Sequence, residues 1–123
     1  KQAPAEIQSR GLTSLTIQNG RKYSTVAVKD ILYFRASTPY IILHLDKKQY
    51  LYTQTLSSLH NQLGRLSFIR IHRSTVVNVE KVVSWKSRLN GDYDISLQNG
   101  ESLRLSRNYV AQFRVAMEKR SSA

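Results

Sequence analysis

Basic and hydroxyl side chains gather where a short alternating segment ends. From Phe68 to His72 apolar and polar residues alternate, which is the period of a half-buried strand. Arg70, His72, Arg73 and Ser74 then bring several hydrogen-bonding groups to one surface turn. Donors held on a rigid strand lose little entropy when they bind an anion or a base edge. A solvated strand end accounts for the same residues, so both interpretations stay open at this point.

A second group of donors lies where the last expected strand meets the last expected helix. It consists of Arg104, Arg107 and Asn108, with Ser106 as the expected N-cap of the helix. The free N–H groups and the positive dipole end of a first helical turn favour a phosphate. A third candidate is the polar loop from Ser37 to Tyr40, which Pro39 stiffens, although most loops of this kind only connect two strands.

Net charge indicates the class of partner. The chain has nineteen Lys and Arg against eight Asp and Glu, a net charge of +11 and an isoelectric point near 10.3. Its 47–78 stretch contains Lys47 and Lys48 and no acidic residue at all, whereas an ordinary surface intersperses both signs. This imbalance predicts a polyanionic partner, most often nucleic acid and less often an anionic membrane surface.

Catalytic and metal-binding chemistry has little support in the residues. Asp92 and Asp94 alternate along an expected hairpin, where we expect them to be merely solvated. His44, His60 and His72 have no metal-motif spacing, and the chain has no cysteine. We expect His44 to be a hydrogen-bonded or half-exposed structural residue and His60 to lie on a helix surface. No nucleophile-elbow serine or phosphate-binding glycine loop occurs, so we predict no enzyme, no catalytic residue, no metal and no cofactor.

Turn signals and hydrophobic periods predict a mainly β domain with about two short helices. Asn-Gly pairs at 19–20, 90–91 and 99–100 mark turns. Helices are expected over 55–63 and over 106–118. In the first, Leu56, Leu59 and Leu63 share one face, Thr53 or Thr55 is the expected N-cap, and Gly64 ends the helix. Strands are expected over 12–18, 21–28, 30–36, 40–45, 49–53, 68–72, 79–86, 93–97 and 102–105.

The length suits one domain with a single hydrophobic core. We expect a flexible linker over 1–11, the folded domain over 12–118 and a C-terminal tail over 119–123. The chain does not start with Met, so we expect further residues upstream. No apolar run approaches the roughly 18 residues that a membrane-spanning helix needs, so no membrane insertion is expected.

Three motifs together resemble the LytTR DNA-binding domain. They are F-I-R-I-H-R-S-T-V-V-N at Phe68 to Asn78, L-S-R-N-Y at Leu105 to Tyr109, and D-I-L-Y-F-R-A at Asp30 to Ala36. The similarity covers roughly Leu12 to Glu118. The resemblance implies an elongated β fold of small packed sheets, a small-sheet sandwich of the LytTR type, in place of a helix-turn-helix.

The resemblance also implies a function. It suggests the output domain of a cytoplasmic bacterial transcription regulator, usually placed after a phosphorylatable receiver domain. Such domains bind double-stranded DNA at paired direct repeats, one domain per repeat, with loops in successive major grooves. A homodimer on DNA is compatible with that arrangement.

Carried over by position, the resemblance assigns roles to individual residues. Arg73 and Arg107 would be the leading base contacts, and Thr38 or Tyr40 would read a base from the first loop, where this chain departs from the pattern by a short turn containing Pro39. The expected phosphate contacts are Arg70, His72, Ser74 and Asn108, to which the basic run adds Lys47 and Lys48. Asn78 would be structural.

Two other binding functions stay open. An RNA-binding module would need stacking aromatics on an open sheet face, for which Tyr33, Tyr50, Tyr52 and Tyr93 are candidates. A basic module without sequence preference would bind any polyanion through charge alone.

Overall fold

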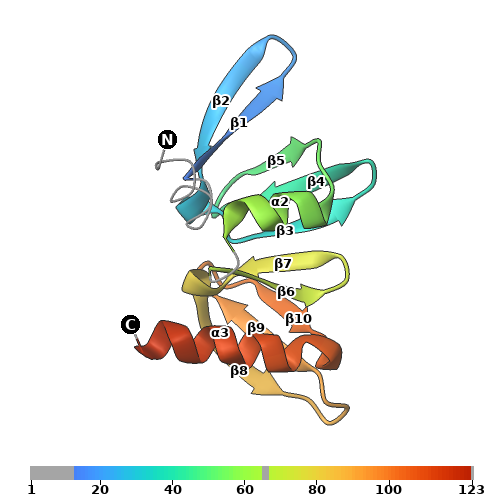
Figure 1. Ribbon diagram of the computed structural model, residues 1–123, viewed down its shortest axis with the longest axis vertical. Helices are drawn as coiled ribbons and strands as arrows, with labels where there is room; N and C mark the ends of the chain where they lie inside the picture. Colours follow the sequence, from blue (N-terminus) through green and yellow to red (C-terminus); the bar gives the residue numbers. More distant parts are fainter. Residues whose placement is uncertain (1–12, 65–66, 123) are drawn as a thin grey trace, which may run out of the picture.

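A computed structural model describes residues 13–64 and 67–122 of the chain, so the expected linker lies outside the described residues. The molecule is elongated and mainly β, as predicted (Figure 1). The strands are β1 Ser14–Asn19, β2 Lys22–Ala27, β3 Tyr33–Ser37, β4 Tyr40–His44, β5 Gln49–Tyr52, β6 Phe68–His72, β7 Thr75–Asn78, β8 Val82–Ser87, β9 Tyr93–Leu97 and β10 Ser102–Leu105. The helices are α2 Leu56–Leu63 and α3 Val110–Ser122, with short 3-10 helices η1 Val28–Asp30, η2 Val79–Lys81 and η3 Arg107–Tyr109.

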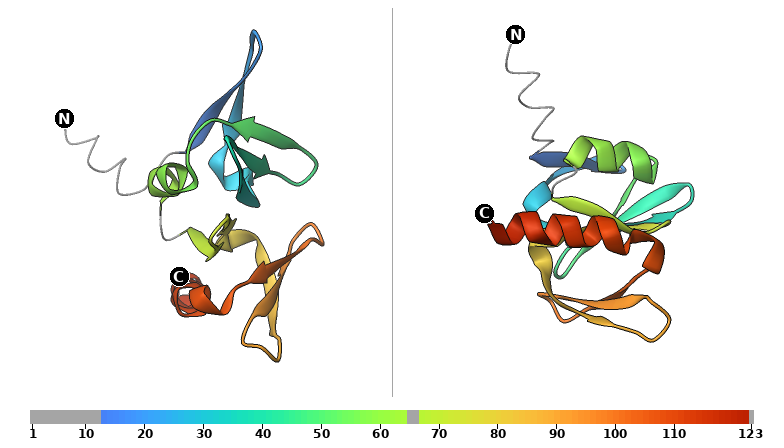
Figure 2. Two further views of the ribbon diagram at one scale, coloured as in Figure 1. Left: turned by 90° about the vertical axis from the view of Figure 1, so that its right-hand side faces the viewer. Right: turned by 60° about the horizontal axis from the view of Figure 1, so that its bottom comes forward.

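Three antiparallel sheets follow one another along the long axis (Figure 1). The β1–β2 hairpin forms one end, a five-stranded sheet of order β5-β4-β3-β7-β6 lies in the middle, and a three-stranded sheet of order β10-β9-β8 forms the other end. Helices α2 and α3 lie on opposite sides of β6 and β7 (Figure 2). The middle sheet is therefore covered on both faces.

Two hydrophobic cores result from this stacking. Phe34 faces the first core together with α2 and the hairpin, whereas its neighbour Tyr33 faces the second core together with the three-stranded sheet and α3. Val76 and Val77 of the paired strand divide between the cores in the same way. Because successive strand residues point to opposite faces, a strand buried on both sides needs a continuous apolar run.

Helix α2 begins and ends where the sequence predicts. The Thr55 hydroxyl accepts a hydrogen bond from the Ser58 N–H at 3.1 Å, and Gly64 follows the last turn with φ of 94°. The prediction that His60 lies on the helix surface is wrong, because its side chain is only 8% exposed. Its Nε2 lies 2.6 Å from the Phe68 carbonyl oxygen, so the imidazole joins α2 to β6.

Two strand predictions and one helix boundary also differ from the structure. The strands expected over 30–36 and 79–86 start later than predicted, because the short 3-10 helices η1 and η2 occupy the beginnings of these ranges. The last helix continues beyond Glu118 to Ser122, into the expected tail. The Arg120 guanidinium donates hydrogen bonds to the carbonyl oxygens of Val79 and Val82, which attaches the end of α3 to the η2–β8 segment.

Asn78 connects the two halves of the molecule, in agreement with its expected structural role. The side chain is buried at 2% exposure. Its Nδ2 donates to the Ile31 carbonyl oxygen at 2.9 Å, and its Oδ1 accepts from the Glu80 N–H at 3.0 Å. One amide therefore fixes the segment that enters β3 and the 3-10 turn that leaves β7.

Replacing Asn78 should lower the stability of the domain. We expect Asn78→Ala to reduce the free energy of unfolding by about 1–3 kcal/mol, since the Ile31 carbonyl would lose its buried donor. Denaturant unfolding measures this change. Asn78→Leu keeps the side-chain volume without the hydrogen bonds, so it should be destabilised too, and wild-type stability in this variant would contradict the role of the amide.

Candidate nucleic-acid interface

Three turns that are distant in the sequence lie on the same side of the molecule, at the right in Figure 1. They are the β3–β4 turn, the β6–β7 turn and η3. The Ala36 N–H donates to the Ser74 carbonyl oxygen at 2.9 Å, and the Ser106 N–H donates to the Ile71 carbonyl oxygen at 2.9 Å. The backbone thus joins each turn to the next one.

Arg70 stabilises the β6–β7 turn from the face of the sheet that α2 covers. Its Nη1 donates to the Arg73 carbonyl oxygen at 2.8 Å and its Nη2 donates to the Ser57 hydroxyl at 3.2 Å. Arg73 itself is exposed, and within residues 13–64 and 67–122 no hydrogen bond or ion pair involves its guanidinium. The structure therefore gives Arg70 a positioning role and leaves Arg73 directed to solvent. The phosphate contact of Arg70 stays a prediction.

His72 and Ser74 form a compact network within the same turn. His72 Nδ1 accepts a hydrogen bond from the Ser74 N–H at 3.1 Å and lies 2.9 Å from the Ser74 hydroxyl. Because Nδ1 accepts, the proton of the neutral ring resides on Nε2. His72 therefore retains one N–H donor for an external acceptor.

Arg107 lies across the turn that joins β8 and β9. Its backbone N–H donates to Asp92 Oδ1 at 2.9 Å, and its Nη1 donates to the Asn90 carbonyl oxygen at 3.3 Å. Gly91 lies beneath it with φ of 94°, and a Cβ there would come within 3.5 Å of the Arg107 Cβ. The Ser106 hydroxyl accepts from the Asn108 N–H at 3.4 Å, which confirms the expected N-cap.

The expectation that Asp92 and Asp94 are merely solvated is wrong. Arg104 forms ion pairs of 3.4 Å with each of them, and Arg88 pairs with Asp94 at 2.9 Å. The Arg107 N–H, assisted by Arg104 and Asn90, holds the pKa of Asp92 below its usual range. Asp92 thus positions the start of η3 through its hydrogen bond to the Arg107 N–H.

The β3–β4 turn presents Thr38, Pro39 and Tyr40 at the surface. The Thr38–Pro39 peptide bond is cis, and the Tyr40 side chain is 43% exposed. Because β3 pairs with β7, this turn is adjacent to the turn that carries Arg73. The structure therefore brings Thr38, Tyr40, Arg73 and Arg107 to one side, together with His72, Ser74 and Asn108.

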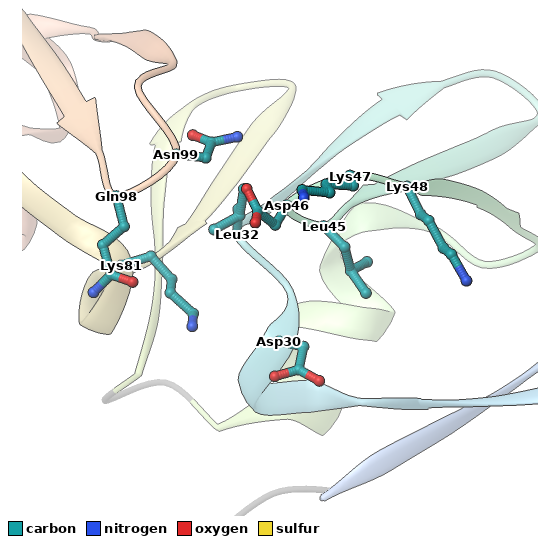
Figure 3. Close-up of a pocket in the computed structure, with 9 residues that line it drawn as sticks. All are labelled: Asp30, Leu32, Leu45, Asp46, Lys47, Lys48, Lys81, Gln98 and Asn99. Atoms are coloured by element: carbon teal, nitrogen blue, oxygen red, sulfur yellow. The ribbon is translucent and has the colours of Figure 1, made fainter.

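Lys47 and Lys48 are not brought to that side. Tyr33 pairs with His44 at one end of the β3–β4 ladder and Ser37 with Tyr40 at the other, so the β4–β5 turn lies a strand length away, roughly 17 Å. There the two lysines line a hollow of about 590 Å³ together with Lys81, Asp30 and Asp46 (Figure 3). Asp30 and Asp46 lie among these lysines, whereas no carboxylate lies among the cations of the β6–β7 turn in the described part of the chain.

Sequence reasoning missed Arg35, which lies on β3 beside the β6–β7 turn. Its Nε donates to the Thr75 hydroxyl at 3.3 Å, and the side chain is exposed. The signal in the sequence was weak: one charged residue at the end of the apolar run from Ile31 to Phe34. Only the pairing of β3 with β7 shows that this cation adjoins His72 and Ser74.

The tyrosines proposed for base stacking are used in packing. Tyr33 is buried, stacks on the half-buried His44 ring at 4.3 Å and donates to Glu101. Burial lowers the pKa of His44, which favours its neutral, structural form. Tyr50 and Tyr52 pack against the first core, and Tyr93 packs against the second. This arrangement argues against an RNA-binding sheet face.

Metal binding and a membrane-spanning helix find no support in the described residues. No three His, Asp or Glu side chains are placed to hold a metal ion within 13–64 and 67–122. Among these same residues, no helix is both long and apolar enough to cross a bilayer.

Comparison with known proteins identifies relatives of this chain. The family model described as LytTr DNA-binding domain matches residues 21–118. The LytTr DNA-binding domain of a methyl-accepting/DNA response regulator from Bacillus cereus has the same fold, with a TM-score of 0.78, 23% identity, and coverage of 87% of this chain and 98% of that one.

Curated relatives are longer than this chain. The "Sensory transduction protein LytT" of Enterococcus faecalis is 29% identical over 82% of this chain and 42% of its own length. The protein of the same name from Bacillus subtilis is 27% identical over 85% of this chain and 43% of its own length. The "Transcriptional regulatory protein LytR" of Staphylococcus aureus is 23% identical over 85% and 42%. The chain thus spans about two-fifths of these relatives.

Removing the Asp92 carboxylate should weaken DNA binding, although loss of a negative charge would by itself favour a polyanion. We expect Asp92→Ala to release the Arg107 N–H and lower DNA affinity severalfold. Asp92→Asn retains an oxygen acceptor and should bind more tightly than Asp92→Ala. Titration of a labelled duplex measures both variants, and tighter binding by Asp92→Ala would contradict the positioning role.

The Asp92–Arg107 contact should titrate at low pH. Because the folded-state pKa of Asp92 is depressed, its stabilising effect is present above the unfolded-state value of roughly 3.9 and is lost as pH falls through the lower folded-state pKa. The Arg107 amide resonance in NMR spectra should therefore shift with a midpoint below roughly 3.9. A midpoint above that value would contradict the depressed pKa.

Proposed function

Because this chain belongs to the LytTr DNA-binding domain family, we propose that it binds double-stranded DNA sequence-specifically as the output domain of a bacterial transcription regulator. One observation supports this most strongly: three turns joined by backbone hydrogen bonds carry Tyr40, Arg73 and Arg107 on one side of the molecule (Figure 1). A rigid row of donors along an elongated body matches a ligand that extends in one direction.

The proposed mechanism separates positioning from reading. Arg73 and Arg107 read bases in the major groove, where a guanidinium forks onto guanine O6 and N7. Thr38 and Tyr40 add a contact from the β3–β4 turn. His72, Ser74, Asn108 and Arg70 hold phosphates, which set the register without carrying sequence information. The activity is binding, without turnover, cofactor or metal.

The proposed operator is a pair of direct repeats with one domain on each. The turns succeed one another along the long axis, which suits contacts in successive major grooves (Figure 1). Two adjacent copies on DNA allow a homodimer. Since the relatives are about twice as long as this chain, we infer an upstream receiver or sensor domain in a cytoplasmic regulator.

A basic module without sequence preference is the second candidate function. The net charge of +11 favours it, because counterion release drives binding to any duplex. The two candidates differ in one measurable quantity, the ratio of affinities for a selected site and for random DNA.

Arg73→Ala and Arg107→Ala should each cost about 1–3 kcal/mol on the preferred site and relax specificity at one base pair. Selection from random duplexes supplies the site, expected to contain two direct repeats bound at least ~10³ times more tightly than random DNA. Titrations on selected and random duplexes then measure each variant.

Lys29→Ala is the matched control, because it removes one exposed cation from η1, at the other end of the strands. Its affinity for the selected site should fall less than that of either arginine variant. Equal losses of an arginine variant on both duplexes would assign that arginine to a phosphate. The absence of any enriched sequence would leave the charge-driven function.

A further inference from the structure

A hollow of about 250 Å³ lies beside the β6–β7 turn, and we name it the Arg35 hollow. Arg35, His72, Ser74, Thr75 and Arg104 line it, with two apolar residues completing the wall. None of the lining residues is acidic. Its volume is several times the roughly 30 Å³ of one water molecule, so a phosphodiester group with water fits inside.

The Arg35 guanidinium is held in place before any ligand binds. Arg35 and Thr75 are direct partners across β3 and β7, and the Arg35 Nε donates to the Thr75 hydroxyl at 3.3 Å. The guanidinium carbon lies 5.4 Å from the centre of the Tyr33 ring, which attracts the cation through its π face. Because Tyr33 is buried and stacked on His44, the support for Arg35 is rigid. Preorganisation lowers the entropy lost on binding.

The charge of Arg35 is not neutralised by an acid. Among the described residues no carboxylate forms an ion pair with it, and its bond to Thr75 uses one of five guanidinium N–H groups. Arg104, the other arginine of the hollow, is ion-paired with both Asp92 and Asp94. Of the two arginines that line the hollow, Arg35 is therefore the one whose charge is available to an anion.

Hydrogen bonds link three other lining residues, Thr75, Ser74 and His72, to Arg35. The Thr75 hydroxyl lies 3.4 Å from the Ser74 hydroxyl, which lies 2.9 Å from His72 Nδ1. Since Nδ1 is occupied, the His72 N–H donor is at Nε2. Arg35 on β3, Thr75 on β7 and His72 on β6 thus belong to one network around the same hollow.

We propose that the Arg35 hollow binds one phosphate of the DNA backbone, with Arg35 as its main ligand. This inference rests on the proposed function and adds a residue and a defined subsite to it. A guanidinium binds phosphate oxygens through charge-assisted hydrogen bonds. The hollow adjoins the β6–β7 turn, and Arg35 is three residues before Thr38 of the β3–β4 turn, so a phosphate held there fixes both turns against the duplex.

The test combines Arg35→Gln with duplexes in which single phosphates are replaced by neutral methylphosphonates. The full 123-residue chain is titrated with the selected site and with random DNA at several salt concentrations. We expect Arg35→Gln to lose about tenfold affinity on both duplexes, because a hydrogen bond to a charged group is lost from each complex. The slope of log affinity against log salt should fall by about one.

The substituted duplexes identify the phosphate. One neutralised phosphate should weaken the wild-type chain about as much as Arg35→Gln does and have no further effect on Arg35→Gln, the coupling expected of direct partners. If every neutralised phosphate weakens both proteins equally, the inference is overturned. Loss confined to the selected site, with one base pair relaxed, would also overturn it, because Arg35 would then read a base.

Controls separate this inference from the proposed function and from misfolding. Lys29→Gln removes one exposed cation far from the hollow and should change the affinity less than Arg35→Gln. Arg35→Lys keeps the charge without the fork, and it replaces Arg35→Gln in the duplex series if thermal unfolding shows that the glutamine variant is not folded. If the wild type shows no sequence preference, the proposed function fails, while the affinity loss and the smaller salt slope of Arg35→Gln are still measured on random DNA.

Discussion

Burial of the middle sheet on both faces is the constraint on which the rest of the structure depends. Tyr33 and Phe34 are neighbours in the chain yet pack into different cores, and Val76 and Val77 do the same on the paired strand. A slip of one residue would exchange the two faces of a strand and place every side chain in the wrong core. The register is therefore strongly specified, and the turns that continue these strands inherit that rigidity.

Two acidic residues of this basic chain, Asp92 and Asp94, serve to position cations. Asp92 binds the backbone of Arg107 and the side chain of Arg104, and Asp94 pairs with Arg88 and Arg104. These contacts neutralise part of the charge while they fix the η3 end of the interface. Arg35 and Arg73 have no such acid among the described residues, so positive charge remains concentrated near the β6–β7 turn. Net charge alone does not show this division.

Local chemistry accounts for the features that the sequence predicted correctly. Thr55 and Gly64 mark the two ends of α2. The N-terminal end needs a hydroxyl cap, which Thr55 supplies, and the C-terminal end needs a residue with positive φ, which is Gly64. Alternation and turn residues likewise predict hairpins from near neighbours in the chain. The surface position of His60 was predicted wrongly because it depends on a non-local contact: β6 covers that side of the helix, and the Phe68 carbonyl oxygen bonds to the imidazole.

The sequence by itself determined the fold class, the family and the motifs that carry Arg73 and Arg107, because these follow from residue types and their order. Tertiary structure decided which cations share a surface. Lys47 and Lys48 lie at the opposite end of the strands from the β3–β4 and β6–β7 turns, whereas Arg35 lies beside residues some forty positions later. Antiparallel pairing causes both outcomes, since it brings distant residues together across a ladder and separates the two ends of every strand.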